Sequence, residues 1–208
     1  MRNHHGERPK RSSGAPTSAG EVMSDSKLNH KVYLFAHSHT GQYVGNKRQC
    51  WDLADRALDY AGAASSSTTG DYDDYVWGTP VGVHQVTAGD ILQFRNHVIT
   101  TTTTTNVTFD DGSGYERTQE KAEQRPHHTA IVAAYKGPTS VLVIEQNYPE
   151  GDRVRQHTLA LSSVAPVSTT SYRSMKDDQG KMRHAKVVVI VEIEVTGQMW
   201  AYRPKAKS

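Results

Sequence analysis

One segment of the chain has the apolar periodicity of an amphipathic helix. It begins at Cys50, and Gly62 stands where such a helix would stop. The apolar positions recur at spacings of three and four residues: Trp51, Ala54, Ala57, Leu58 and Ala61. The pattern predicts a helix of about three turns with Cys50 at its beginning.

Beyond a polar loop, the pattern becomes that of strands separated by Gly and Pro turns. The candidate strands are Ile91–Phe94, a Thr-rich ribbon, Thr129–Tyr135, Val141–Asn147, Val154–Leu161, Lys186–Val195 and Met199–Arg203. A single helix followed by a run of strands favours an α+β fold, with the helix packed on an antiparallel β-sheet.

The segment from Arg95 to Pro126 is set apart by six consecutive threonines, Thr100 to Thr105. Threonine favours strands, and a run of it places hydroxyl groups on both faces of a strand. We expect a solvated β-ribbon that projects from the body as an insertion, with its turn in the Asp-Gly region Asp110–Gly114. A substrate-specificity arm and a disordered segment are the alternatives.

The N-terminal segment differs from the rest in composition. Residues 1–29 carry five basic and three acidic groups, which account for the whole formal net charge of +2, and the remaining residues are neutral. A neutral body argues against a nucleic acid or an anionic membrane as the main partner, because both need a concentrated basic footprint. Residues 1–30, rich in Gly, Ser and Pro, are expected to be a disordered tail, and residues 31–204 a single domain.

The apolar content is low for a globular protein. Apolar residues make up 36% of the chain, and the mean hydropathy is −0.66, so part of the chain is expected to stay outside the core. The longest apolar run, 187–191, is shorter than the ~20 residues of a membrane span, and no apolar stretch of a signal peptide follows Met1. We expect a soluble protein.

Cys50 is the single cysteine. One cysteine excludes an internal disulfide and a multi-cysteine zinc or iron–sulfur site. It is therefore either a buried small apolar group or a reactive thiol. A position at a helix N-terminus favours the thiolate, because the helix dipole and the unpaired N–H groups stabilise negative charge.

A histidine, a carboxylate and an amide are predicted to converge in the strands that follow. If 129–135 and 141–147 form a hairpin closed by Tyr135 opposite Ser140, facing residue numbers sum to 275, and His128 faces Asn147. Glu145 shares that face, because side chains alternate along a strand. Such a group supplies a cysteine nucleophile with a base and an orienting partner. Alternatively, Glu145 and Asn147 only mark the strand's emergence into solvent. His127 should point to the opposite face.

Four motifs, in this order, resemble those of the CHAP domain, a cysteine, histidine-dependent amidohydrolase/peptidase of the NlpC/P60 superfamily with a papain-like arrangement. The motifs are Gln49-Cys50-Trp51, the segment 88–94, the segment 128–132 and Glu145-Gln146-Asn147-Tyr148. The resemblance implies that Cys50 is the nucleophile, His128 the base and later acid, and Glu145 its orienting partner, with Asn147 assisting. It also implies an oxyanion hole from the backbone N–H of Cys50 and the side chain of Gln49, and a structural turn at Asp90.

The resemblance implies a peptide or peptidoglycan amide as substrate, whereas the residues themselves indicate only an amide or ester. The Thr-rich insertion departs from a compact CHAP domain. The alternatives are a catalytically silent binding module on the same scaffold and an acyltransferase of the same superfamily. A metal site at His37 and His39 or at His127 and His128 is disfavoured, because no helical His pair flanked by Glu is present. We expect no cofactor and a monomer.

Overall fold

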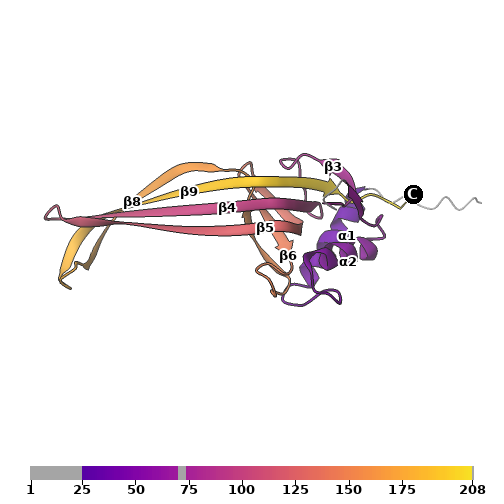
Figure 1. Ribbon diagram of the computed structural model, residues 1–208, viewed down its shortest axis with the longest axis horizontal. Coiled ribbons are helices and arrows are strands. Elements are labelled where there is room, and N and C mark those ends of the chain that lie inside the picture. The colour runs from indigo at the N-terminus through magenta and orange to yellow at the C-terminus, as the bar shows by residue number, and fades with distance from the viewer. Residues whose placement is uncertain (1–24, 70–73, 208) are drawn as a thin grey trace, which may run out of the picture.

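The computed structural model describes residues 25–69 and 74–207. Two helices, α1 (Asp25–Ser38) and α2 (Cys50–Ala61), pack at one end of a large antiparallel sheet (Figure 1). The strands are β1 (Ser67–Thr69), β2 (Asp74–Val76), β3 (Thr79–Val81), β4 (Ile91–Phe109), β5 (Gly114–Gly137), β6 (Ser140–Glu145), β7 (Arg155–Ala160), β8 (Val164–Lys176) and β9 (Met182–Arg203). The α+β class and the antiparallel sheet agree with the sequence-based prediction. No helix among the described residues is long and apolar enough to cross a membrane.

Helix α2 forms where the apolar periodicity predicts it. It begins at Cys50, and Gly62 ends it in the left-handed conformation with φ 74°. Its buried face is made of Leu53, Ala54, Ala57, Leu58 and Ala61. Small side chains on this face bring the helix close to α1 and to the sheet, which fixes the height of Cys50 above the strands.

Helix α1 corrects the boundary expected for the N-terminal tail. It begins at Asp25, so residues 25–30 belong to the folded body, whereas residues 1–24 of the expected tail lie outside the described residues. The helix buries Leu28, Val32 and Ala36 against α2. The residues between Val32 and Ala36 are also apolar (Tyr33, Leu34 and Phe35), so the spacing of four that marks the buried face does not stand out in the sequence.

The main sheet has the order β3-β9-β4-β5-β6-β7, with β8 on the outer side of β9. The β5–β6 hairpin has the predicted register near the helices, where Ile131 pairs with Ile144. At the turn the prediction was wrong, because Gly137 pairs with Ser140 and Tyr135 with Val141. Two β-bulges absorb this difference before the strands reach the helices.

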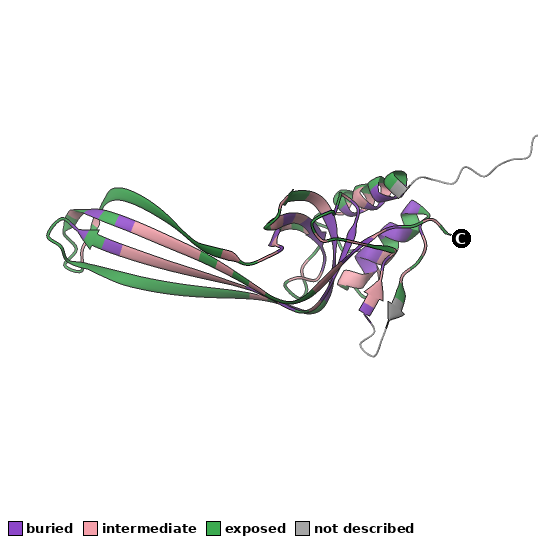
Figure 2. Cartoon of the chain, turned by 90° about the horizontal axis from the view of Figure 1, so that it is seen from above, coloured by how far each residue is buried: buried purple, intermediate pink, exposed green. Residues whose placement is uncertain are grey.

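The long strands β4, β5, β8 and β9 leave the body together as an arm (Figures 1 and 2). The β4–β5 pair continues as the predicted ribbon from Thr100 to Thr108. The arm is larger than the expected insertion 95–126, because the first half of β9 pairs with the other edge of β4, and β8 pairs in turn with β9. The run 187–191, expected with the other strands, therefore lies on the arm, where it pairs with residues 103–107 of β4.

A double irregularity marks the point where the arm leaves the body. The β4–β9 register shifts between Arg95 and Val98, and both Asn96 and Gly197 have a positive φ, 49° and 85°. A Cβ atom on Gly197 would lie 2.0 Å from the carbonyl oxygen of Asn96. Only glycine permits this close approach, so the strands can bend here without losing their pairing on either side.

Candidate active site

Cys50 occupies the first position of α2, with its thiol half-buried. Burial raises the pKa of the thiol, but the hydrogen bond and charge of His128 lower it, as do backbone hydrogen bonds from Thr129 and Trp51. The net pKa lies below the ordinary cysteine value. The helix N-terminus contributes to the same effect.

His128 lies beside Cys50 on β5 and is 6% exposed. Its Nε2 is 3.0 Å from Oε2 of Glu145, which leaves Nδ1 as the ring nitrogen for the sulfur. Burial lowers the pKa of the imidazole, but Cys50 and Glu145 raise it more strongly, to about 9. The rings of Phe94 and Tyr148 flank the imidazole at 6.2 and 5.6 Å between centroids. The arrangement favours a thiolate–imidazolium pair.

Glu145 is fully buried and is surrounded by hydrogen-bond and ion-pair partners. Besides His128, its oxygens lie 2.6 Å from Nε2 of His157 and 3.2 Å from the guanidinium of Arg125. Burial raises the pKa of the carboxyl group, but these partners lower it well below its usual range. Arg125 is itself fully buried beneath the Tyr148 ring, at 3.8 Å. The carboxylate is therefore held ionised and fixed in position.

The predicted contact between Asn147 and His128 is not formed. Strand β6 ends at Glu145, and Asn147 takes a left-handed conformation with φ 61°. Its Nδ2 donates to Oε1 of Gln49 at 2.9 Å, and its Oδ1 accepts from the N–H of Gly151 at 2.7 Å. Because alternation ends with the strand, Asn147 turns away from the histidine and supports the residue that precedes the nucleophile.

Gln49 lies at the rim of the cavity beside Cys50. Its backbone N–H donates to the Asp52 carboxylate at 2.9 Å, which caps α2. Its side-chain Nε2 donates to the carbonyl of Lys47 at 3.3 Å. The role of Gln49 as an oxyanion donor stays a prediction.

Gln146 links the two halves of the site, a role that the sequence did not indicate. The side chain is fully buried. Its Oε1 accepts from the N–H of Val44 at 2.6 Å, and its Nε2 donates to the carbonyls of Val44 and Gln49 at 3.0 and 2.9 Å. Consecutive residues thus hold opposite partners: Glu145 holds the histidine, and Gln146 holds the loop that leads into Cys50.

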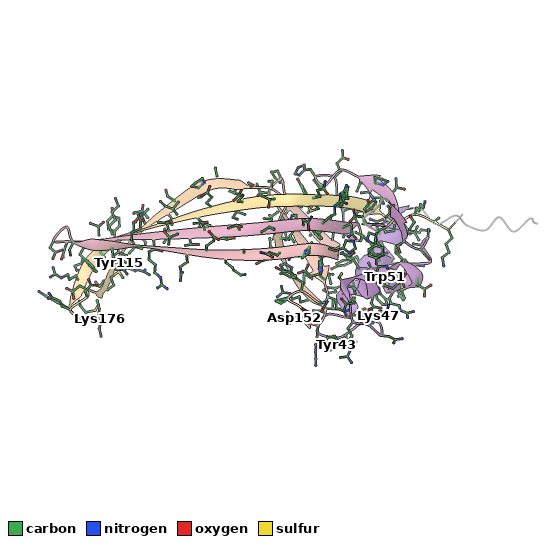
Figure 3. All side chains as sticks on the ribbon, viewed as in Figure 1. Tyr43, Lys47, Trp51, Tyr115, Asp152 and Lys176 are labelled. Carbon is green, nitrogen blue, oxygen red and sulfur yellow. The ribbon has the colours of Figure 1, made fainter. Side chains whose placement is uncertain are left out.

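A cavity of about 600 Å³ opens beside the thiol. It is lined by Lys47, Gln49, Cys50, Trp51, Asp52, Ser66, Ser67, Tyr75 and His127. Lys47 and Trp51 lie on the body, at the opposite end of the molecule from Tyr115 and Lys176 on the arm (Figure 3). His127 contacts Asp74, with Nε2 3.5 Å from Oδ1, and it lies on the opposite strand face from His128, as alternation along the strand requires.

The histidines considered for a metal site serve other contacts. His37 stacks on Tyr33, and His39 Nδ1 lies 2.8 Å from the carbonyl of Phe35, both at the end of α1. Within the described ranges, no group of three His, Cys, Asp or Glu side chains is arranged to hold a metal ion.

A comparison with protein families supports the fold assignment. The family model described as AIM3/BBC1 Cysteine proteinase-fold domain matches residues 15–208. Neither the curated proteins nor the solved structures give a significant match to the chain. The expected papain-like fold is therefore confirmed at the level of the fold, and the family's description names no activity or substrate.

Proposed function

The chain belongs to the AIM3/BBC1 family of cysteine proteinase-fold domains, and we propose that it is a cysteine-dependent amide hydrolase, a peptidase or amidase. The observation that carries the proposal is the chain of contacts from the Cys50 thiol through His128 to the buried Glu145. A nucleophile, a base and an orienting group in contact are what nucleophilic catalysis by cysteine requires.

In the proposed reaction, the Cys50 thiolate attacks the carbonyl carbon of an amide. His128 gives its proton to the leaving amine as the C–N bond breaks, which leaves a thioester on Cys50. The neutral imidazole then takes a proton from water, and the hydroxyl attacks the thioester. The carboxylic acid leaves, and the proton held by His128 restores the ion pair.

Glu145 keeps the imidazole in the required tautomer and orientation throughout. The oxyanion formed in both steps lies near the start of α2, where the backbone N–H of Cys50 and the amide of Gln49 are the proposed donors. The arrangement needs no metal ion or cofactor.

The resemblance to CHAP domains supports a narrower form of the proposal, in which the substrate is a peptide or a peptidoglycan-type amide. It rests on the order of the four motifs and on the Cys–His–Glu contacts. Neither a nucleic acid nor a membrane is a proposed partner, because the body from residue 30 onward carries equal numbers of basic and acidic groups.

Alkylation of Cys50 by iodoacetamide tests the activated pair. We expect the wild type to react at pH 7 at least about tenfold faster than His128→Ala, because the imidazolium holds the thiol ionised. Cys50→Ser supplies the unlabelled control, and its circular dichroism reports folding. Equal rates in the wild type and His128→Ala would overturn the proposal.

Turnover separates the hydrolase from the alternatives. A silent binding module predicts a wild type that turns over no amide and a Cys50→Ser variant that binds ligand unchanged. An acyltransferase predicts that added amines or alcohols appear in the product in place of water. Hydrolysis by the wild type that is lost in Cys50→Ser supports the proposed function.

A further inference from the structure

The cavity beside Cys50 has a wall built from aromatic rings. The ring centroid of Tyr75 lies 6.3 Å from that of Trp51 and 5.4 Å from that of His127. Behind it, the fully buried Trp77 lies 5.4 Å from the same tyrosine. The Trp77 indole is anchored by a hydrogen bond to Gln93 at 3.1 Å. The rings therefore form a preformed wall, held in place by their packing and by the Trp77 hydrogen bond. None of them takes part in the contacts among Cys50, His128 and Glu145.

The charge in the cavity is one-sided. Asp52 is buried and accepts the N–H of Gln49, so its charge is committed to the helix start. Asp74, behind His127, pairs with Arg95 at 2.9 Å. Lys47 is exposed and forms no ion pair within the described ranges 25–69 and 74–207. Apart from the Cys50 thiolate, whose charge is paired with His128, the charge presented to a ligand is thus the positive charge of Lys47.

The residues that line the cavity show where it lies relative to Cys50 and His128. A leaving amine must lie within reach of His128, which would protonate it. Cys50 lines the cavity but His128 does not, and the neighbouring His127 contributes from the opposite face of β5. A ligand in the cavity would therefore lie beside the thiol and away from His128, which suits the acyl side of a scissile bond.

We propose that this cavity binds the acyl side of a peptide substrate, with an aromatic side chain against Tyr75 and Trp51 and an acidic group near Lys47. The inference rests on the proposed function and adds the substrate class to it. Offset or edge contacts between rings stabilise an aromatic side chain beyond the burial of its area. A carboxylate near the exposed ammonium adds a weaker, salt-dependent preference.

Tagged dipeptidyl acyloxymethyl ketones test the proposal, because the thiolate displaces the acyloxy group as a carboxylate and forms a stable thioether. Four probes vary the two acyl-side residues: Glu-Phe, Lys-Phe, Glu-Ala and Lys-Ala. Labelling of Cys50 is followed with time, and rates are compared as ratios between probes. We expect Phe probes to react about tenfold or more faster than Ala probes. Glu-Phe should exceed Lys-Phe by a few-fold, less at high salt.

Variants assign each preference to its residue. Tyr75→Ala should reduce the Phe-to-Ala ratio, and Lys47→Glu should invert the Glu-to-Lys ratio. Tyr135→Ala and Lys136→Glu make the same changes near the β5–β6 turn, where both side chains are exposed, and should leave the ratios as in the wild type. Melting temperatures report whether each variant folds.

The outcomes distinguish the two proposals. Equal labelling by all four probes, or faster labelling by the Ala probes, overturns the aromatic–acidic cavity while the hydrolase proposal stands. If no probe labels Cys50 and iodoacetamide shows no dependence on His128, the proposed function itself fails. Preferences that persist in Tyr75→Ala and Lys47→Glu would also overturn the assignment.

Discussion

Glu145 illustrates how single residues in this protein serve two purposes. Burying a carboxylate completely destabilises the fold unless interactions with its partners offset the free energy of desolvation. Here His128, His157 and Arg125 all contact it, and each would be unfavourable in this position without it. The site is therefore a compact charge network in which the orienting group for the histidine also neutralises a buried arginine.

The pKa values of the pair predict how activity depends on pH. His128 has its pKa raised to about 9, so it is protonated below that pH and can protonate a leaving amine. We expect hydrolysis to fall as pH rises through about 9, while iodoacetamide labelling persists, because the thiolate remains. Both rates should fall at acidic pH, below the lowered pKa of Cys50. Parallel pH profiles of hydrolysis and labelling check this, and loss of labelling together with hydrolysis near pH 9 would contradict it.

Gln146 should matter as much as the residues of the charge network. Gln146→Glu keeps the size but removes the two N–H donors and places a negative charge against two carbonyl oxygens. We expect a loss of about 2–4 kcal/mol in unfolding free energy, and slower labelling of Cys50. Denaturant unfolding and iodoacetamide kinetics measure both.

Asn147→Ala provides the matched comparison for Gln146→Glu. Its contacts with Gln49 and Gly151 are exposed to solvent, so the loss should stay near 1 kcal/mol. Equal effects of the two variants would contradict the linking role of Gln146.

Part of the site could be predicted from the sequence and part could not. Local signals located Cys50, His128 and Glu145: a helix start and the alternation of two adjacent strands. Arg125 and His157 reach Glu145 from another part of β5 and from β7, which depends on strand pairing that no local pattern encodes. Asn147 was misplaced because the strand ends two residues before it.

At the scale of elements, the bend between arm and body depends on Gly197. Gly197→Ala adds a Cβ that meets the Asn96 backbone at a strained positive φ. We expect a loss of more than 2 kcal/mol in unfolding free energy. Gly112→Ala is the control, since its φ is 84° but its Cβ would meet no atom within 4 Å, and it should lose about 1 kcal/mol. Urea unfolding compares them, and equal losses would show that the close approach is unimportant.

A helix or strand was predictable from the sequence when its apolar face was clearly distinct from its polar face. Helix α2 has a continuous buried face and was located from its periodicity. Helix α1 and strand β8 were missed, because α1 has no clear division into an apolar and a polar face and the Ser- and Thr-rich β8 is almost entirely exposed. The valine-rich half of β9 was recognised as a strand, but its partners were not, since periodicity says nothing about which strand lies alongside.

At the scale of the whole molecule, the arm accounts for the low apolar content. Neither of the two described helices packs on a face of its sheet (Figures 1 and 2), and β8 and the first part of β5 are mostly exposed. A small apolar cluster near the tip, made of Val107, Phe109, Ala185 and Val187, is separate from the two clusters of the body. The residues of the arm are mostly polar because both faces of its sheet are exposed to solvent.

The arm predicts an elongated particle in solution. A compact globular chain of 208 residues has a radius of gyration of about 17 Å, and we expect small-angle scattering to give a clearly larger value with an extended tail in the distance distribution. A chain that starts at Met23 separates the contribution of residues 1–22. A radius near 17 Å for that chain would contradict the projecting arm.

The continuous pairing of β4 with β9 also has a consequence for folding. Ile91 pairs with Tyr202 and Thr105 with Val189, on either side of the register shift at the base of the arm, so strands distant in the chain must pair correctly along both arm and body. The β4–β5 and β8–β9 hairpins close locally, but the step that joins them carries a large loop entropy and sets a slow folding rate. Until that step, the valine-rich strand exposes an unpaired edge. Refolding should therefore compete with intermolecular strand pairing, and dilution should raise its yield.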